Sequence, residues 1–371
     1  MKSEWRTVAL GSVADLTVGF VGTMASNYTE TGIPFLRSTN IEPFDIKLDD
    51  IKYISSNFNE SLRKSELHPN DVVIVRTGTP GACAVIPAGV KAWNCSDLVI
   101  VRPHRNKLNP LFLASYVNLA SGVINTQLVG AVQQHYNVGA AKKMQIPLPP
   151  IGEQDKIASI IGMLNKKITI NSKINDNLEQ QAQSYFQELF VDNADPEWTT
   201  GTISDLGTVV GGSTPSKAKP EYYTESGIAW ITPKDLSNNK SKFVSHGEND
   251  ITELGLRNSS ASIMPEGTVL FSSRAPIGYI AIAAGEVTTN QGFKSVVPKP
   301  EIGTPFVYFF LKNTLPVIEG MASGSTFKEV SGSTMKNVPA VIPDAETLAK
   351  FSDFCAPIFA QQRILEEQNQ S

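Results

Sequence analysis

The chain has 371 residues, of which 41% are hydrophobic and 18% charged, and its formal net charge is −4. This length suits two ordinary domains with a core each, and the charge excludes a polycation that binds DNA by phosphate neutralisation alone. No apolar run reaches the roughly eighteen residues that cross a bilayer, no signal-peptide pattern is present, and the three cysteines form no CxxC pair, so we expect a cytoplasmic protein without membrane contact, disulfides or a metal site.

The first 150 residues predict a module in which short strands predominate. Residues 33–36, 71–75 and 98–101 are apolar or β-branched runs bounded by turn residues, which is typical of strands. Residues 110–120 begin with a proline and predict a helix. This module carries 14 Lys and Arg against 11 Asp and Glu, a balance of +3.

Residues 151–191 predict a long helix with a coiled-coil seam. Apolar or aromatic residues recur at alternating steps of four and three, which is the spacing of such a seam. The expected seam and partner-docking residues here are Ile157, Ile161, Leu164, Ile168, Asn171, Asn175 and Leu178. The two asparagines leave two interpretations open, because a buried asparagine can fix register, whereas an exposed one would only mark a locally solvated stretch.

Residues 192–343 predict a second module, and residues 344–371 a second, shorter helix. Strands are expected at 268–271 and 295–297 and a helix at 305–313, with 12 Lys and Arg against 15 Asp and Glu, a balance of −3. The second helix repeats the seam with Leu348, Phe351 and Ile358. Pro357 is expected to kink or break it.

The two modules align in order, which indicates an internal duplication. Trp5 aligns with Trp198, and the strings from Gly32, Pro69 and Lys143 align with those from Gly227, Pro265 and Met335, at offsets between 192 and 196. We therefore predict an α+β protein of two duplicated, strand-rich mixed α/β modules. Two long antiparallel coiled-coil helices separate them in a pseudo-twofold arrangement. The expected domains are 1–150, 151–191, 192–343 and 344–371.

Several strings, taken together, resemble a known family. They are Gly211-Gly-Ser-Thr-Pro215, Ile228-Ala-Trp-Ile-Thr-Pro-Lys-Asp-Leu236, Ser272-Ser-Arg-Ala-Pro-Ile-Gly278, Asn290-Gln-Gly-Phe293, Gly324-Ser-Thr326 and Ile146-Pro-Leu-Pro-Pro-Ile-Gly-Glu-Gln154. The ordered set resembles the specificity (S, HsdS) subunits of type I restriction–modification systems, and the resemblance covers the whole chain.

The resemblance implies a non-catalytic subunit that recognises a bipartite double-stranded DNA target. Each module would be a target-recognition domain that reads one half, and the helices would set the gap between the halves. The helices would also dock two methyltransferase (modification) subunits, which carry S-adenosylmethionine. Restriction subunits, which use ATP and Mg²⁺, would join that complex. No cofactor is expected on this chain itself.

Polar residues in loops next to the predicted strands are the candidates for DNA contact, since such side chains read base edges and phosphates. One such residue alone is most often a solvated turn residue, but several of these loops recur in both modules. The candidates are Arg37, Ser38, Thr39, Asn40, Arg76, Thr77, Lys91, Asn94, Gln133, Gln134 and Tyr136 in the first module, and Thr232, Lys234, Ser273, Arg274, Asn290, Gln291, Thr326 and Lys328 in the second.

Enzymatic motifs are missing from the sequence. It has no GxxxxGK[ST] loop and no Gly-rich strand–turn–helix for a nucleotide cofactor. Asp45-Ile-Lys47 and Asp50-Ile-Lys52 have the Asp-x-Lys form of metal-dependent nucleases, but the second module lacks them. The rival hypothesis is a duplicated scaffold that binds protein or carbohydrate instead of DNA.

Overall fold

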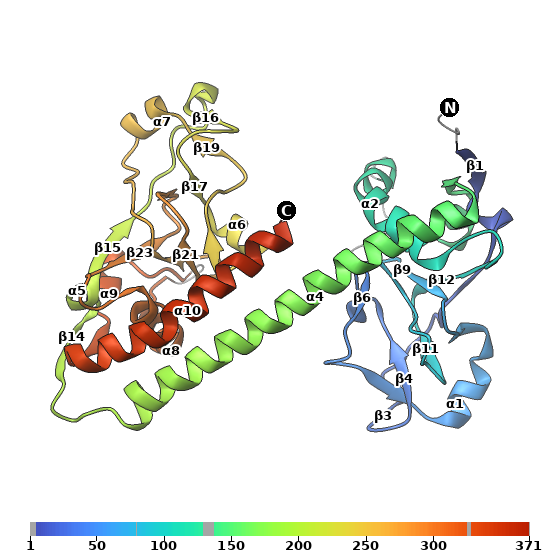
Figure 1. Ribbon diagram of the computed structural model, residues 1–371, viewed down its shortest axis with the longest axis horizontal. Coiled ribbons are helices and arrows are strands. Elements are labelled where there is room, and N and C mark those ends of the chain that lie inside the picture. The colour runs from blue at the N-terminus through green and yellow to red at the C-terminus, as the bar shows by residue number, and fades with distance from the viewer. Residues whose placement is uncertain (1–4, 79, 129–136, 325–327, 371) are drawn as a thin grey trace. The chain divides into compact units, whose positions relative to one another are not determined.

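Figure 1 shows the computed structural model of the chain, which describes residues 5–78, 80–128, 137–324 and 328–370. It divides into two compact units, Met1–Lys167 and Ile168–Ser371. The division falls inside helix α4 (Ile151–Gln187). The first part of α4 packs through Ile157 and Ala158 on the core of unit 1, and its last part packs through Ala182 and Phe186 on the core of unit 2.

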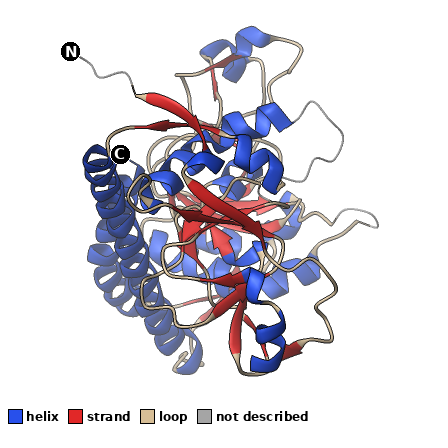
Figure 2. Ribbon diagram, turned by 90° about the vertical axis from the view of Figure 1, so that its right-hand side faces the viewer, coloured by secondary structure: helices blue, strands red, loops and turns tan. Residues whose placement is uncertain are grey.

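Unit 1 contains a four-stranded sheet in the order β10-β9-β12-β2 and a five-stranded sheet in the order β3-β7-β4-β11-β8. Its strands are short and joined by loops and turns (Figure 2). The strands are β1 (Arg6–Ala9), β2 (Ala14–Val18), β3 (Tyr28–Thr29), β4 (Ile33–Leu36), β5 (Ile41–Glu42), β6 (Asp45–Ile46), β7 (Lys52–Ile54), β8 (Glu66–Leu67), β9 (Val72–Val75), β10 (Cys83–Val85), β11 (Trp93–Cys95), β12 (Leu98–Pro103) and β13 (Gln145–Leu148). Its helices before α4 are α1 (Ser56–Ser61), α2 (Pro110–Leu128) and α3 (Val138–Lys143).

Unit 2 is built around one five-stranded sheet in the order β15-β23-β20-β21-β18. Its strands are β14 (Thr199–Thr202), β15 (Gly207–Gly211), β16 (Tyr223–Thr224), β17 (Trp230–Ile231), β18 (Phe243–Val244), β19 (Asp250–Ile251), β20 (Val269–Ser273), β21 (Ile277–Ala283), β22 (Thr288–Thr289), β23 (Lys294–Pro298) and β24 (Pro339–Ile342). Its helices are α5 (Ile203–Leu206), α6 (Pro233–Asn238), α7 (Glu253–Arg257), α8 (Thr304–Met321), α9 (Gly332–Lys336) and α10 (Ala345–Gln370).

The two units share one strand order, which confirms the duplication at the level of topology. The order β2-β12-β9-β10 of unit 1 corresponds strand for strand to β15-β23-β20-β21 of unit 2. A helix follows the equivalent strand in each unit: α2 comes after β12, and α8 comes after β23. The predicted helices at 110–120 and 305–313 are therefore confirmed, but both run further than expected, and α8 continues through Pro316.

In each unit, the first strand pairs with the last strand before the long helix. β1 runs antiparallel to β13, with Arg6 opposite Leu148, and β14 runs antiparallel to β24, with Thr199 opposite Ile342. This pairing places the start of each module next to its end. Each long helix then begins shortly after the second strand of the pair.

Helix α10 lies antiparallel to the second half of α4 within unit 2 (Figure 1). Near the C-terminal end of α10, the Asn171 side chain donates a hydrogen bond to Asn369 at 2.9 Å. In the first half of α10, the ring centroids of Tyr185 and Phe354 are 4.5 Å apart. The antiparallel pairing expected from the two seams is therefore confirmed for this half of α4.

Pro357 does not break α10, and the expected break is wrong. A proline removes the hydrogen bond to the carbonyl four residues earlier, which here belongs to Asp353. Both Asp353 and Pro357 lie on the exposed face of α10. Water can therefore satisfy the carbonyl that Pro357 leaves without a partner.

No helix among the described residues is both long enough and apolar enough to cross a membrane.

Candidate nucleic-acid interface

Unit 2 brings Arg274, Lys294 and Glu329 together at the end of β20. Arg274 directly follows β20, and its backbone forms an isolated bridge with Glu329. Its Nη1 lies 3.5 Å from Oε2 of Glu329, and Nζ of Lys294 lies 3.8 Å from Oε1 of the same carboxylate. The Arg274 side chain is 37% exposed. A guanidinium group that pairs with a carboxylate through one nitrogen, and whose other nitrogens are accessible, can still donate hydrogen bonds to a base or a phosphate.

The turn before β23 lies beside this cluster. Ser273 donates its backbone N–H to the carbonyl of Gly292 at 2.7 Å, which joins the end of β20 to the turn. Asn290 stabilises the turn itself, because its Oδ1 accepts a hydrogen bond from the Gly292 N–H at 2.8 Å. Gln291 is exposed and accepts a hydrogen bond from the hydroxyl of Thr214.

Burial lowers the pKa of Lys294, although the neighbouring Glu329 carboxylate opposes that effect. Its Nζ also donates to the carbonyl of Gln291 at 3.3 Å. Lys294 is half-buried and holds Glu329 and the turn in place, whereas the side chain of Lys328 is exposed to solvent.

The loop before α6 meets the same turn. Pro233 lies so close to Gly292 that a Cβ there would be 3.0 Å from the proline Cγ. Thr232 is the N-cap residue of α6, and Oδ2 of Asp235 accepts hydrogen bonds from its backbone N–H at 2.7 Å and from its hydroxyl at 2.6 Å. Lys234 is exposed and pairs with Glu248 at 2.5 Å, and this hydrogen bond raises the pKa of Lys234. Three loops predicted from the sequence therefore converge in unit 2.

Unit 1 places an arginine at the equivalent position but holds it differently. Arg76 directly follows β9, and its Nη1 lies 2.9 Å from Oδ1 of Asp97. Thr77 donates its hydroxyl to the other oxygen of that carboxylate at 2.8 Å. The Arg76 side chain is only 15% exposed. The carboxylate comes from the turn before β12 here and from the segment after α8 in unit 2, so the two arginines differ in partner and in access.

The loop after β4 adjoins this turn, since Ser96 donates its backbone N–H to the carbonyl of Leu36 at 3.0 Å. Arg37 follows Leu36 and pairs with Asp50 at 2.9 Å. The hydrogen bond from Arg37, with a second from Lys52, lowers the pKa of Asp50 to about 2. Asp50 is thus a partner of two cations, and this pairing accounts for one of the two Asp-x-Lys strings.

The structure contradicts three of the predicted DNA contacts. The side chains of Asn40, Asn94 and Ser273 are buried. Asn94 donates to Asn59 at 2.9 Å, Asn40 donates to the carbonyl of Lys47 at 3.0 Å, and Ser273 donates to the carbonyl of Gly292 at 3.1 Å. These side chains stabilise the loops and cannot reach a base edge, so the prediction is wrong for all three.

The other candidates lie in different places. Ser38 is half-buried, and Thr39 and Lys91 are exposed. Gln133, Gln134, Tyr136 and Thr326 lie outside the described residues.

Sequence reasoning missed the two carboxylates that hold the arginines, Asp97 and Glu329. Both are far in sequence from the arginine that they contact, and acidic residues carry no DNA-binding signal by themselves. Lys294 was also missed, although it directly follows the string Asn290-Gln-Gly-Phe293, and Thr214 lies in Gly211-Gly-Ser-Thr-Pro215.

The residues placed by the structure contain no cluster of three or more His, Cys, Asp or Glu side chains that could hold a metal ion. Cys83, Cys95 and Cys355 are buried free thiols. Burial raises the pKa of all three, that of Cys355 to about 12, which leaves them as unreactive thiols at neutral pH.

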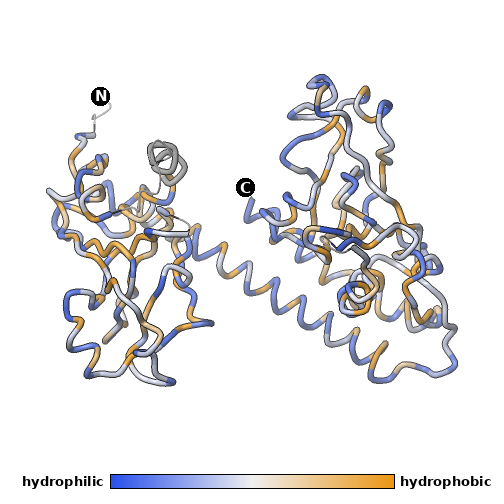
Figure 3. The backbone as a smooth tube through the Cα atoms, turned by 180° about the vertical axis from the view of Figure 1, so that it is seen from behind, coloured by the Kyte–Doolittle hydropathy of each residue, from blue (hydrophilic) through white to orange (hydrophobic). Residues whose placement is uncertain are grey.

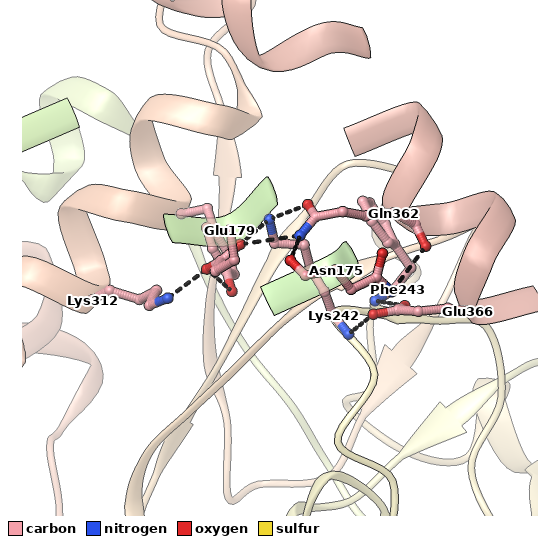
Figure 4. A network of polar contacts seen from close by, with 8 residues as sticks. Asn175, Glu179, Lys242, Phe243, Lys312, Gln362 and Glu366 are labelled. Atoms are coloured by element: carbon pink, nitrogen blue, oxygen red, sulfur yellow. Dashed lines mark hydrogen bonds and ion pairs between the residues drawn. The ribbon is translucent and has the colours of Figure 1, made fainter. Parts of the chain in front are cut away.

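A second polar cluster joins the long helices to unit 2 (Figure 4). The carboxylate of Glu179 on α4 is 2.6 Å from Nζ of Lys242 and 2.5 Å from Nζ of Lys312. Burial alone would raise the pKa of Glu179, but the two ammonium groups lower it below its ordinary value. From α10, Gln362 accepts from Lys242 at 2.8 Å and donates to the carbonyl of Asn175 at 3.1 Å.

The loop before β18 is further fixed by α10. Both oxygens of Glu366 accept backbone hydrogen bonds, from Lys242 at 2.8 Å and from Phe243 at 3.0 Å (Figure 4). The ammonium of Lys242 also lies 3.8 Å from the centroid of the Phe359 ring, a cation–π contact. The cluster thus connects α4, α8, α10 and the sheet of unit 2.

The predicted seam residues fall into three groups. Asn171, Asn175 and Leu178 face α10 or the core of unit 2, and Leu348, Phe351 and Ile358 are buried. Ile157 and Ile161 are half-buried in unit 1, whereas Leu164 and Ile168 are exposed. The buried interpretation of Asn171 is confirmed, because its side chain is 5% exposed and bonded to Asn369.

Comparison with known proteins agrees with this architecture. The sequence model of the type I restriction modification DNA specificity domain matches residues 2–180 and again residues 196–370. The specificity subunit of the type I restriction enzyme MjaIX of Methanocaldococcus jannaschii is 39% identical over 194 residues, which cover 50% of this chain and 45% of that protein. The match thus spans less than half the length of that relative.

Two further similarities cover more of the chain. The putative type I restriction enzyme MjaX specificity subunit of M. jannaschii is 21% identical over 357 residues, covering 87% of this chain and 80% of that protein. The crystal structure of the S subunit of a type I restriction–modification system from M. genitalium has a TM-score of 0.59 at 15% identity, and covers 99% of this chain and 91% of that one. This last similarity establishes the fold.

Proposed function

Because the chain belongs to the family of type I restriction–modification DNA specificity subunits, we propose that it is the non-catalytic subunit that recognises a bipartite double-stranded DNA target. Unit 1 would read one half of the target and unit 2 the other half. The observation that supports this proposal best is the repeat. The two units share one strand order, and each has an arginine directly after the equivalent strand, Arg76 after β9 and Arg274 after β20.

The chemistry of the loops supports reading of DNA in unit 2. Arg274 is accessible, Gln291, Lys234 and Lys328 are exposed, and three loops converge on the turn before β23. Arginine, lysine and glutamine are the side chains that contact base edges and phosphates. In unit 1, Thr39 and Lys91 are the exposed counterparts, and Arg76 is mostly buried.

We propose further that the long helix α4 docks two methyltransferase subunits, which carry S-adenosylmethionine, and that restriction subunits using ATP and Mg²⁺ join that complex. Hydrophilic and hydrophobic positions alternate along α4 (Figure 3). Besides its seam, α4 exposes large apolar side chains at Ile160, Met163, Ile170 and Ile174. Exposed apolar side chains that gather on one element mark interaction surfaces. We propose no cofactor for this chain itself.

The net charge of −4 makes the partners necessary for strong binding. A protein that neutralises few phosphates binds DNA weakly at physiological salt, and its affinity falls only gently as salt rises. We therefore expect the chain to bind DNA more tightly, and with a steeper salt dependence, when a methyltransferase subunit is bound to it.

The test is methylome sequencing of the host with and without this chain. Loss of methylation from one bipartite motif, and from no other, is the expected result. If every methylated motif is retained, the proposal is wrong.

The second candidate function, a scaffold that binds protein or carbohydrate, is favoured only by the low basicity. Retention on a DNA column over a salt gradient separates the two, with the chain applied alone and with the methyltransferase. Retention that is insensitive to salt in both states supports the scaffold.

A further inference from the structure

The carboxylate of Asp97 in unit 1 is more exposed than the arginine that holds it. The Asp97 side chain is 40% exposed, whereas that of Arg76 is only 15% exposed. The two oxygens of Asp97 are held separately, because Oδ1 lies 2.9 Å from Nη1 of Arg76 and Oδ2 accepts a hydrogen bond from the Thr77 hydroxyl at 2.8 Å. A carboxylate can accept about four hydrogen bonds. Asp97 can therefore accept more on its exposed side, whereas the guanidinium of Arg76 is largely enclosed.

The backbone at Asp97 has an unusual conformation that the surrounding structure holds in place. Its φ angle is 52°, in the left-handed region that aspartate and asparagine tolerate better than most residues. The N–H of Asp97 donates to the carbonyl of Phe20 at 3.1 Å, and the N–H of Ser96 donates to that of Leu36 at 3.0 Å. The turn is thus fixed to two neighbouring segments. Unusual backbone conformations that the structure enforces in this way are concentrated at functional sites.

Unit 2 also pairs its arginine with a carboxylate, but from another part of the module. Arg274 and Lys294 face Glu329, whose side chain is 39% exposed. Glu329 comes after α8, whereas Asp97 lies in the turn before β12, so the two carboxylates do not correspond in the internal repeat. Each unit nevertheless places an accessible carboxylate beside the arginine that follows the equivalent strand. The same pair, built from two different segments, indicates that the carboxylate has a role of its own.

The charge of such a pair suits a base edge better than a phosphate, because the two groups neutralise each other and a carboxylate repels the DNA backbone. In the major groove, the hydrogen-bond donors are the amino groups of cytosine and adenine. Adenine presents its N7 acceptor beside that amino group, and this acceptor repels a carboxylate. Cytosine presents its N4 amino group and no acceptor. A side chain that only accepts hydrogen bonds therefore selects cytosine.

We propose that Asp97 is a specificity-determining residue of unit 1, and that its carboxylate accepts a hydrogen bond from the N4 amino group of a cytosine in the DNA target. Arg76 and Thr77 are positioning residues, which hold the carboxylate in one orientation. Asp97, and not Arg76, is then the side chain of this cluster that contacts the DNA. This inference rests on the proposed function and deepens it, because it names the base and the residue that reads it.

The test compares the methylomes of hosts that carry the wild type, Asp97→Asn or Asp15→Asn, each with its methyltransferase. Asparagine keeps the size of aspartate, tolerates the left-handed backbone and still accepts from Thr77, but its amide also donates, which suits N6 and N7 of adenine. We expect Asp97→Asn to change one cytosine in one half of the motif to adenine, or to either base, and to leave the other half unchanged. Asp15→Asn is the matched control, since the side chain of Asp15 on β2 is 83% exposed, and it should retain the wild-type motif.

A second measurement uses the wild-type complex and does not depend on the stability of a variant. Each cytosine of the motif is replaced in turn by N4-methylcytosine in a DNA duplex. This base keeps the amino hydrogen that forms the base pair and loses the one that faces the major groove. The affinity of the wild type should fall about tenfold or more at one cytosine. Asp97→Asn should not show that loss at the same position.

Three results would overturn the proposal. The first is an unchanged motif in Asp97→Asn. The second is a wild-type motif without a C·G pair in either half. The third is wild-type affinity that N4-methylcytosine lowers at no position, and this measurement also decides the case in which Asp97→Asn loses all methylation, because an insensitive wild type leaves Asp97 only a structural role. If the wild type confers no bipartite motif at all, the proposed function itself is wrong, which is a result distinct from these three.

Discussion

The ammonium of Lys242 lies 2.6 Å from the carboxylate of Glu179. This ion pair connects the loop before β18 to the second half of α4. Glu179 is shared with Lys312 on α8, so one carboxylate balances two cations from different elements of unit 2. The side chain of Lys242 is 6% exposed. Its charge therefore depends on Glu179 and on the surrounding aromatic rings rather than on water.

Glu179→Gln should strongly destabilise unit 2. The substitution keeps the size of the side chain but leaves two ammonium groups without their counter-charge, one of them buried. Removing one partner of a buried ion pair costs about 3–5 kcal/mol. Urea unfolding followed by tryptophan fluorescence measures the change. Asp176→Asn is the control, because residue 176 is an exposed acid on the same helix, and it should change the free energy of unfolding by less than about 0.5 kcal/mol.

The stabilisation by Glu179 should disappear in acid. Its pKa in the folded state is lowered below the ordinary glutamate value of about 4.3. The carboxylate therefore contributes fully above that ordinary value, and its contribution is lost as the pH falls through the lower folded-state pKa. The difference in unfolding free energy between the wild type and Glu179→Gln should shrink over that range. A difference that is constant from pH 7 to pH 3 would contradict the assignment.

The two equivalent arginines should respond differently to truncation. Arg76→Ala removes a mostly buried ion pair and should lower the free energy of unfolding by about 1–3 kcal/mol. Arg274→Ala removes a partly exposed pair at 3.5 Å and should cost less than about 1 kcal/mol. Thermal unfolding of both variants tests this order, and equal losses would contradict it.

Arg274→Ala should relax or abolish methylation that depends on one half of the target and leave the identity of the other half unchanged. A side chain that contacts a base contributes about 1–3 kcal/mol of discrimination. Methylome sequencing of a host that carries the variant measures the effect. Lys299→Ala, at an exposed lysine after β23, is the control. An unchanged motif in the Arg274 variant would exclude this loop from sequence reading.

Pro357→Ala should stabilise the chain, because the alanine restores a hydrogen bond to the carbonyl of Asp353 and has a much higher helix propensity. An interior proline costs about 3 kcal/mol relative to alanine in a helix, and solvent access at this position offsets part of that cost. We expect a gain of about 1–2 kcal/mol in urea unfolding. A loss would mean that the backbone at residue 357 is adapted to the proline ring.

The repeat and the seams could be predicted from sequence because both are periodic. Residues 33–36 were predicted as a strand with the bounds that β4 has, and the pairing of Asn171 with α10 follows from the seam spacing. The end of α8 could not be predicted, because the helix runs through Pro316, and proline usually marks a boundary.

The candidate interface was predicted only in part, for a physical reason. The loops were found because polar residues follow apolar strands, but this pattern does not say which side chains face solvent. Asn40 and Asn94 satisfy buried backbone and side-chain groups within unit 1. Their role depends on partners at Lys47 and Asn59, and no local pattern marks such partners.

The pairing of β1 with β13, and of β14 with β24, gives each module a closed neck. Both strands of each pair belong to the same module, and the other strands of that module come between them in the sequence. A genetic exchange with breakpoints on either side of residues 199–342 would therefore replace one module whole and leave the other neck and both long helices intact. If each module reads one half of the target, as proposed above, such an exchange would change half of the target in one recombination event.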